Sequence, residues 1–484
     1  MVNLFDPTRW GLPAEAVDQL ADKLQAFWEH FRPCFRTRTR DTSVNALTFL
    51  RGQLTMEDQR NFANIERRVT GGDGQTLQHF MSNSPWSGPA VFRQIQADIR
   101  AHPALQTGGL VILDESADVK AGTGSAGAGR QHNGRLGKIE LSVVATSLVY
   151  VHPATGTWTL VDGELFLPQA WFGRGSAARR AAVGISKKRR FATKPELGLA
   201  MIERAHAQGL PFARVACDEL YGRNRALRAA LDRLGLGYAA QVPANTQVYL
   251  QPPQVGIPRR RHRHGRAPTR VRVRSRQQPH TAYQLTRRAA TPWKRVQVRH
   301  TERGVLEAEF AVVRVWTLTE AMEVRAEWLV LRRDLSGQLT FTLLNGAADT
   351  PECELIEQSC WRFFTERTYE DAKSELGWAD FQAQKYRAWE HELALTGAST
   401  WFAASVKLAW RERYRRDPEL AQQLAVEVLP ALSTANVRDL LMAVLPLRQL
   451  TPDAARRLVV RHLVNRARST GSRLKTQRQH HDSS

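Results

Sequence analysis

Two aspartates follow short apolar runs in the middle of this chain, and their positions suggest chemistry on phosphates. Asp114 ends the run in GGLVILD (residues 108–114), and Asp218 ends the run in ARVACD (residues 213–218). Such runs are consistent with buried strands, and sites in open α/β sheets tend to lie beyond the carboxyl ends of strands. Mg²⁺ prefers carboxylate oxygens, and phosphodiester chemistry often uses two such ions. We therefore interpret both aspartates as candidate metal ligands, although Asp114 alone could instead cap a turn.

A third carboxylate is usual in such a site, and the predicted helix SCWRFFTERTYEDAKSELGW (residues 359–378) offers one. At about 100° per residue, Arg362, Glu366 and Lys373 fall within roughly 40° of one another. Glu370 lies near that face, so helix geometry gives Glu366 only a small advantage over it. The pattern could be a solvated stripe of ion pairs. It also fits a site in which Glu366 holds a metal while Arg362 and Lys373 bind the surrounding phosphates.

The spacing of these three residues resembles a known signature. R-x(3)-E-x(6)-K matches the third motif of the DDE transposases of bacterial insertion sequences, in the group written Y-x(2)-R-x(3)-E-x(6)-K. The Tyr position of that motif holds Ser359 here, which concerns contacts with the DNA end rather than the metal site. Further stretches resemble the endonuclease domain of this superfamily: LQHFMSNSPW (77–86), ILDESADVKAG (112–122), GRQHNGRLGKIE (129–140), TKPELGLAMIERA (193–205) and CDELYGRN (217–224).

The resemblance implies both a fold and an activity. The fold would be ribonuclease H-like, with Asp114, Asp218 and Glu366 as catalytic and metal-binding residues, and the family spacing favours Glu366 over Glu370. Two Mg²⁺ ions are expected, with Mn²⁺ as a substitute. The activity would be that of a transposase that binds terminal inverted repeats, cleaves DNA with Mg²⁺-activated water and transfers the 3′-hydroxyl ends to target DNA. Such enzymes act as dimers on paired double-stranded DNA ends.

Two other functions are compatible with the same residues. One is a structure-specific nuclease of the same fold, although such enzymes are usually shorter and lack a basic insertion. The other is a transposase-derived DNA-binding protein that has lost catalysis, which the intact acidic triad argues against. Short inverted repeats flanking the gene would favour the transposase.

The elements around the two aspartates predict a mixed α/β sheet in the order β-β-β-α-β-α-β. The expected strands cover residues 109–114, 139–151, 157–166, 213–218 and 238–243, and the expected helices cover residues 194–210 and 224–235. Because successive strand residues point to opposite faces, Glu115 and Glu219 are expected to point away from the neighbouring aspartates.

Changes in composition along the chain predict five regions. They are a helical DNA-binding region (1–106), the first part of the catalytic core (107–250), a basic β-rich insertion (251–350), the second part of the core with the Glu helix (351–410), and a helical C-terminal region (411–484). The final residues, RSTGSRLKTQRQHHDSS, are expected to be disordered.

The charge of the chain indicates a polyanionic partner. Lys and Arg number 69 against 47 Asp and Glu, which gives a net charge of +22, and residues 233–301 contain no acid at all. DNA is the expected partner. The candidate contacts, besides Arg362 and Lys373, are Arg259, Arg260, Arg261, Arg130 and Lys138.

The sequence shows no sign of a membrane or secreted protein. No stretch approaches the roughly 18 apolar residues of a spanning helix, and the first residues lack the pattern of a secretory signal. The four cysteines have no paired zinc-ligand spacing, so we expect reduced thiols. Together these features predict a cytoplasmic, nucleoid-associated protein.

Overall fold

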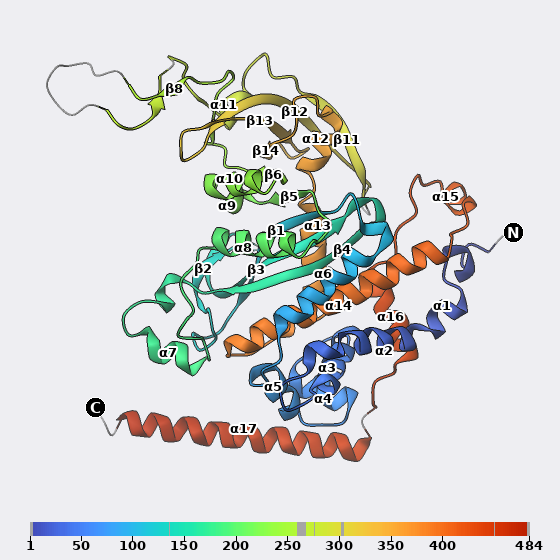
Figure 1. Ribbon diagram of the computed structural model, residues 1–484. Coiled ribbons are helices and arrows are strands. Elements are labelled where there is room, and N and C mark those ends of the chain that lie inside the picture. Colours follow the sequence, from blue (N-terminus) through green and yellow to red (C-terminus); the bar gives the residue numbers. More distant parts are fainter. Residues whose placement is uncertain are drawn as a thin grey trace.

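The computed structural model describes residues 3–134, 136–258, 268–274, 276–301, 304–449 and 451–481. Its elements form a twisted mixed sheet with helices packed against it, a group of N-terminal helices, and one long helix near the C-terminus (Figure 1). Arg259, Arg260 and Arg261, which were predicted to contact DNA, lie outside the described residues.

The N-terminal region is helical, as predicted. Its helices are α1 (Ala14–Asp18), α2 (Leu20–Phe31), α3 (Ser43–Thr55), α4 (Phe62–Val69), α5 (Gln75–Ser82) and α6 (Gly88–Ala101). Apolar residues at helical spacing point into the main core, where Phe31, Phe49 and Phe80 are buried, whereas Leu24 is buried in a second cluster.

The central sheet combines antiparallel and parallel strands. Its strands are β1 (Leu110–Val119), β2 (Gly129–Asn133), β3 (Lys138–His152), β4 (Thr157–Phe166), β5 (Arg214–Cys217) and β6 (Gly237–Gln241). Strand β1 is antiparallel to β3, and β3 is antiparallel to both β2 and β4. Strands β1, β5 and β6 are parallel neighbours. This mixed sheet agrees with the ribonuclease H-like fold class that the resemblance implied.

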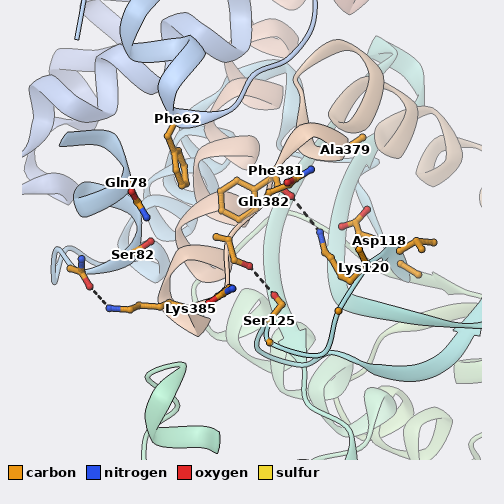
Figure 2. Close-up of a pocket in the computed structure, with 18 of the residues that line it drawn as sticks. Phe62, Gln78, Ser82, Asp118, Lys120, Ser125, Ala379, Phe381, Gln382 and Lys385 are labelled. Atoms are coloured by element: carbon orange, nitrogen blue, oxygen red, sulfur yellow. Dashed lines mark hydrogen bonds between the residues drawn. The ribbon is translucent and has the colours of Figure 1, made fainter. Parts of the chain in front are cut away.

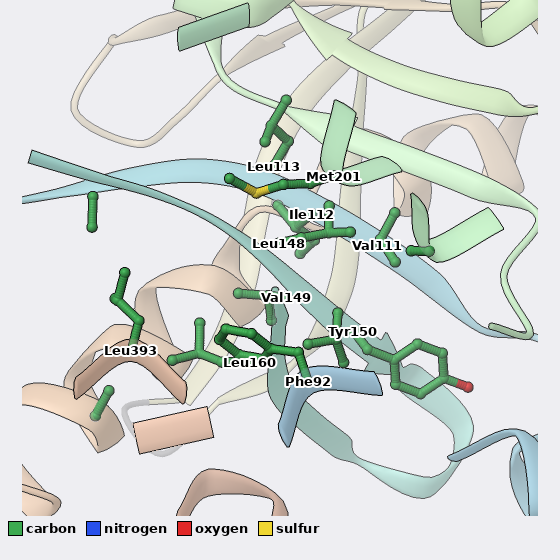
Figure 3. Packing of buried hydrophobic residues seen from close by; sticks show 14 of the residues in the cluster. Phe92, Val111, Ile112, Leu113, Leu148, Val149, Tyr150, Leu160, Met201 and Leu393 are labelled. Atoms are coloured by element: carbon green, nitrogen blue, oxygen red, sulfur yellow. The ribbon is translucent and has the colours of Figure 1, made fainter. Parts of the chain in front are cut away.

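Helices cover both faces of this sheet. Helix α8 (Lys194–Ala207) packs on β3 and β4 from one side, and α14 (Tyr386–Arg413) runs along β4 together with α6. Figure 3 shows Leu113 beside Met201 of α8, whereas Leu393 of α14 lies toward the other side of the strands. The sheet is therefore a buried layer, and a polar side chain on it must find a partner on one helix or another.

The insertion continues the same sheet. Strand β14 pairs with β6, and the strands then follow in the order β14, β13, β12 and β11. Their bounds are β11 (Lys294–Thr301), β12 (Gly304–Leu318), β13 (Val324–Arg333) and β14 (Leu339–Leu344). Smaller elements complete this part: β7 (Gln247–Val248), β8 (Val255–Gly256), β9 (Arg272–Val273), β10 (His280–Thr281) and α11 (Ala282–Thr286). The catalytic part and the insertion thus share one backbone ladder.

The remaining helices lie between the strands in the chain or follow the last strand. They are α7 (Ser176–Ala182), α9 (Glu219–Gly222), α10 (Arg225–Arg233), α12 (Glu352–Ser359), α13 (Phe363–Glu370), α15 (Glu419–Gln423), α16 (Thr434–Val444) and α17 (Pro452–His481). Among the described residues, none of the helices is both long enough and apolar enough to cross a membrane.

Three predicted boundaries were wrong. The first strand does not end at Asp114, because β3 pairs with β1 as far as Val119. The helix predicted over 359–378 is interrupted between α12 and α13 and leaves α-helical geometry at Asp371. The tail predicted to be disordered continues α17 to His481, since its Arg, Lys, Leu and Gln residues favour helix and it has no proline.

Candidate active site

The strand register brings Asp114 and Asp218 to the same edge of the sheet. The parallel ladder of β1 and β5 ends at the pair Leu113 and Cys217, and the two aspartates are the next residues of their strands. The chain then turns at Asp218, which caps α9 by accepting a hydrogen bond from the Tyr221 backbone N–H at 3.2 Å. The sequence predicted this meeting of carboxylates, and the parallel pairing explains it.

Alternation along β1 separates its acidic side chains, as expected. Asp114 and Asp118 face α13 and the turn that follows it, where each finds a basic partner. Glu115 points to the α8 side, where it accepts hydrogen bonds from Lys194 Nζ at 2.6 Å and from the Tyr221 hydroxyl at 2.9 Å. Glu115 is therefore already paired within the protein.

Arg362 is the cation nearest the two aspartates. Its guanidinium donates to Asp114 Oδ2 at 3.2 Å and to the Gln241 side chain, at the end of β6, at 2.8 Å. Burial alone would lower the pKa of Arg362, but the carboxylates of Asp114, Asp218 and Glu366 together raise it above its usual value. Arg362 therefore remains charged and neutralises part of this acidic cluster.

Burial and mutual repulsion disfavour two negative charges at this edge. Burial raises the pKa of Asp114 to about 6, Arg362 opposes the shift, and Asp218 and Glu115 add to it. The pKa of Asp218 is raised by burial in the same way, with Arg362 again opposing and Glu115 adding. Adjacent carboxylates of this kind form a set of oxygen donors, and a bound divalent cation would stabilise their ionised form.

Glu366 lies one helical turn after Arg362 on α13, and its side chain is exposed. Its carboxylate is near enough to raise the pKa of Arg362. However, no group of three or more His, Cys, Asp or Glu side chains in the described part of the chain could hold a metal ion as it stands. Glu370, the alternative third ligand, forms an ion pair with Arg367 at 2.9 Å.

Lys373 does not share the α-helical stripe that the sequence predicted. Residues Asp371–Glu375 form a π-helical turn, so the angle of 100° per residue no longer applies beyond Glu370. Lys373 Nζ lies 3.0 Å from Asp118 Oδ1 and 3.1 Å from the Ala117 carbonyl oxygen. Arg362 and Lys373 thus hold α13 and the turn along β1 through two separate ion pairs, with Glu366 between them in the chain.

A polar cavity of about 1100 Å³ begins at the Lys373–Asp118 ion pair. It lies between the N-terminal helices, the segment that follows β1, and residues 379–385 (Figure 2). Lys120 on its wall donates to the Phe381 carbonyl oxygen at 3.4 Å. The cavity therefore begins at the Asp118 end of β1, four residues beyond Asp114, and presents lysine side chains.

The remaining predicted contacts do not gather around the two aspartates. Arg130 on β2 and Lys138 on β3 are exposed, and Lys138 pairs with Glu140 at 2.7 Å. At about 3.3 Å per residue, Lys138 lies roughly 30 Å along β3 from the strand partner of Asp114. Ser359, at the position of the family Tyr, is buried and donates to the Ile356 carbonyl oxygen at 2.6 Å.

Sequence reasoning missed three side chains of this site. Gln241 orients Arg362, Lys194 neutralises Glu115, and the half-buried Tyr369 forms a hydrogen bond with Ser147 of β3 at 2.6 Å. Lys194 lies within one of the stretches that resemble the endonuclease domain, so that stretch was an available signal. Gln241 and Tyr369 had no pattern of their own in the sequence.

Comparison with known proteins identifies the family of this chain. The family model for DDE superfamily endonucleases matches residues 30–305, a range that contains both aspartates and ends before Glu366. The probable transposase for insertion sequence element IS701 of Microchaete diplosiphon is 24% identical over 329 residues, which cover 66% of this chain and 71% of that protein. Since the family model matches more than half of the chain, this protein belongs to the DDE superfamily of endonucleases.

Proposed function

We propose that this protein is a DNA transposase that uses Asp114, Asp218 and Glu366 to cut and join phosphodiester bonds. The observation that carries the proposal is the adjacency of the buried Asp114 and the half-buried Asp218 at the end of the β1–β5 ladder. The similarity to the probable IS701 transposase favours transposition over another endonuclease activity. The net charge of +22 supports DNA as the substrate.

The residues of the site have distinct roles in this proposal. Asp114 and Asp218 would hold Mg²⁺, or Mn²⁺ in its place, and α13 would supply Glu366 as the third ligand. When bound, the ions would activate the attacking water or 3′-hydroxyl and stabilise the charge that develops on the phosphate. Arg362 would bind oxygens of that phosphate, and Lys373 would neutralise phosphates of the strand near the adjoining cavity.

Cleavage of the flanking DNA tests this function. Purified protein should cut a linear duplex that carries the inverted repeats bordering its own gene when Mg²⁺ is present. Asp114→Asn and Asp218→Asn should each abolish cutting while duplex binding, measured with Ca²⁺ in place of Mg²⁺, stays within about twofold of wild type, since each removes one metal ligand. Asp349→Asn makes the same chemical change at an exposed loop and should cut like wild type.

Other outcomes would separate the alternatives. Cutting that persists in EDTA would reject the metal mechanism. Cutting of branched or hybrid duplexes in preference to the repeats would indicate a structure-specific nuclease. Tight repeat binding without cutting by the wild-type protein would indicate a chain that has lost catalysis.

We also propose that two chains act together on paired DNA ends. Helix α17 supports this arrangement, because Val459, Val460, Leu463 and Val464 are exposed on it in the described structure. The mass of the protein–DNA complex, measured by light scattering in the same binding experiment, counts the chains. A complex of one chain per end that never pairs would contradict it.

A further inference from the structure

A second cavity, lined by arginines, lies beyond the short helix that Asp218 caps. Its volume is about 260 Å³, and three arginines contribute to its wall: Arg223, Arg225 and Arg228. Thr246 of the loop after β6 and Gln247, the first residue of β7, form another part of the wall. No carboxylate lines this cavity among the residues that the structure describes. Its lining is therefore basic and rich in hydrogen-bond donors.

The positive charge of the cavity is only partly neutralised within the described structure, by the ion pair of Arg228 with Glu327. Arg223 and Arg225 are exposed, and neither side chain makes an ion pair with any described residue. Arg228 is only 3% exposed, and its Nε has no hydrogen-bond partner in the described part of the chain, although Glu327 Oε1 lies 3.6 Å away. Both Glu327 oxygens already accept hydrogen bonds, from the Tyr238 hydroxyl at 2.5 Å and from Thr317.

The backbone fixes this cavity relative to Asp218. Helix α9 consists of Glu219–Gly222, with Asp218 at its start and Arg223 as the residue that follows it. A Cβ added at Gly222 would lie 1.9 Å from the Gln241 carbonyl oxygen, so α9 packs directly against the end of β6. At about 1.5 Å of rise per helical residue, the Arg223 backbone lies roughly 7 Å from that of Asp218.

We propose that this cavity binds a backbone phosphate of the DNA strand whose cleaved bond lies at Asp114 and Asp218. Guanidinium groups bind phosphate oxygens through paired charge-assisted hydrogen bonds, and the amide of Gln247 and the hydroxyl of Thr246 can donate as well. Successive phosphates of one strand are separated by about 3.4 Å along the helix axis and by more than that in space, so the bound phosphate is expected within about three nucleotides of the cleaved one.

This assignment rests on the proposed function and adds a specific contact to it. Backbone contacts carry no sequence information but fix the register of a strand in a protein. Held on both sides of α9, the strand could not slide along the edge of the sheet. The cavity would thereby determine which phosphodiester bond meets the aspartates.

A charge-matched pair of variants tests the contact. Arg223→Gln/Arg225→Gln empties the cavity of its two unpaired charges and leaves the buried Arg228 in place. Arg233→Gln/Arg288→Gln removes two charges from exposed side chains outside the cavity. Both proteins are compared with wild type on repeat duplexes in which one phosphate at a time is replaced by a neutral methylphosphonate, with Ca²⁺ present and no cutting.

One position in the duplex should respond. A neutral linkage within about three nucleotides of the cleavage point should weaken wild-type and control binding about tenfold. The same linkage should have no further effect on the Arg223→Gln/Arg225→Gln protein, whose affinity is already reduced. Equal sensitivity of this protein and the control at every position would overturn the proposal.

Inorganic phosphate distinguishes DNA from a small ligand. The melting temperatures of wild type and control could rise with phosphate but not with sulfate at equal ionic strength, with no such rise in the Arg223→Gln/Arg225→Gln protein. If the duplex then shows no position-specific effect, the cavity binds a free phosphate compound, and the DNA contact is overturned. Because these readouts need binding alone, a protein that shows the position-specific effect but never cuts would refute the proposed activity and keep the contact.

Discussion

Asp114 and Asp218 are held at one edge of the sheet by different backbone contacts. Asp114 lies within strand β1 and pairs with Ser147 of β3. Asp218 follows the end of β5 and caps α9. The Asp114 side chain is bound by Arg362, whereas within the described part of the chain the Asp218 side chain accepts hydrogen bonds from backbone donors alone. The carboxylate pair is thus fixed in position, while its charge is only partly neutralised by Arg362.

At this scale the third ligand can be decided by experiment. Glu366→Gln should lower the cleavage rate by several orders of magnitude, because loss of a metal-binding carboxylate removes both metal and transition-state stabilisation. Glu370→Gln is the matched control on the same helix. It removes only the exposed pair with Arg367, so its rate should change by no more than a few-fold.

Single-turnover cutting of the repeat duplex measures both rates, after circular dichroism and duplex binding have shown that the variants are folded and competent. If Glu370→Gln is inactive and Glu366→Gln still cuts, then the register assigned to α13 is wrong. The role proposed for Arg362 would then fail as well, because it depends on the same spacing.

Elements of the sheet could be predicted from the sequence because local rules determine them. Alternation placed Asp114 and Glu115 on opposite faces, and parallel strands brought Asp114 beside Asp218. The π-helical turn could not be predicted in this way, since Lys373 is held there by Asp118, a residue distant in the chain. The basic cavity also depends on distant contacts, because the β6–β7 loop and the end of β12 complete its wall.

Helix α14 carries a buried carboxylate whose charged form is disfavoured by burial. Glu392 on this helix is 1% exposed, and its Oε1 accepts hydrogen bonds from Thr396 at 3.1 Å and from Gln53 at 3.4 Å. Its Oε2 has no partner in the described structure. Burial raises the pKa of Glu392 from its usual 4.5 to about 8, so the protonated side chain is favoured in the folded protein.

The stability of the protein should therefore fall as pH rises between these two values. Over that range the folded state binds the proton that the unfolded state has lost, and the loss is at most about 1.4 kcal/mol per pH unit. Glu392→Gln should flatten this part of the profile and raise the melting temperature at pH 8. Glu412→Gln, an exposed residue of the same helix, should leave the profile unchanged. Parallel profiles for wild type and Glu392→Gln would show that Glu392 is ionised throughout.

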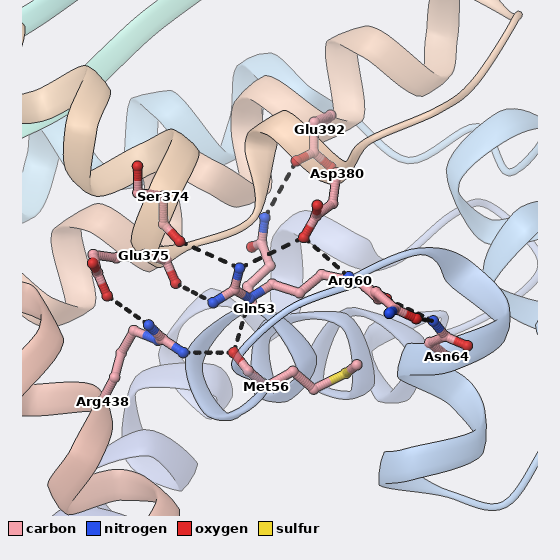
Figure 4. Close-up of polar contacts among 10 residues, drawn as sticks. Gln53, Met56, Arg60, Asn64, Ser374, Glu375, Asp380, Glu392 and Arg438 are labelled. Atoms are coloured by element: carbon pink, nitrogen blue, oxygen red, sulfur yellow. Dashed lines mark hydrogen bonds and ion pairs between the residues drawn. The ribbon is translucent and has the colours of Figure 1, made fainter.

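At the scale of the whole molecule, a buried cluster of polar contacts around Arg60 and Arg438 connects parts that are distant in the chain (Figure 4). Arg60 follows α3 and donates to the backbone carbonyl oxygens of Met56 at 2.9 Å and Glu375 at 2.8 Å. Burial lowers the pKa of Arg60 to about 10, and the nearby Arg438 adds to the shift. A Cβ added at Gly377 would lie 2.3 Å from Arg60 Cδ, so a glycine is needed for this approach.

Arg438 on α16 completes the connection between the N-terminal helices, the π-helical turn and the C-terminal region. It donates to Glu375 Oε2 at 2.6 Å and to the same Met56 carbonyl oxygen at 2.5 Å. Arg438→Met should lower the free energy of unfolding by about 2–3 kcal/mol, because it leaves a half-buried carboxylate unpaired and removes one donor from a buried carbonyl. Arg411→Met, an exposed arginine of α14, should change it by less than about 0.5 kcal/mol.

The same variant tests whether this cluster supports the site from a distance. The turn carries Lys373 and follows α13, so hydrogen exchange of the Asp371–Glu375 amides should become faster in Arg438→Met, and cleavage should slow while duplex binding is kept. Adding Glu375→Gln should recover part of the lost stability, since the unpaired charge is then gone, but should not restore cleavage. If Arg438→Met melts about 5 °C or more lower yet cuts at the wild-type rate, the cluster stabilises the fold without positioning α13.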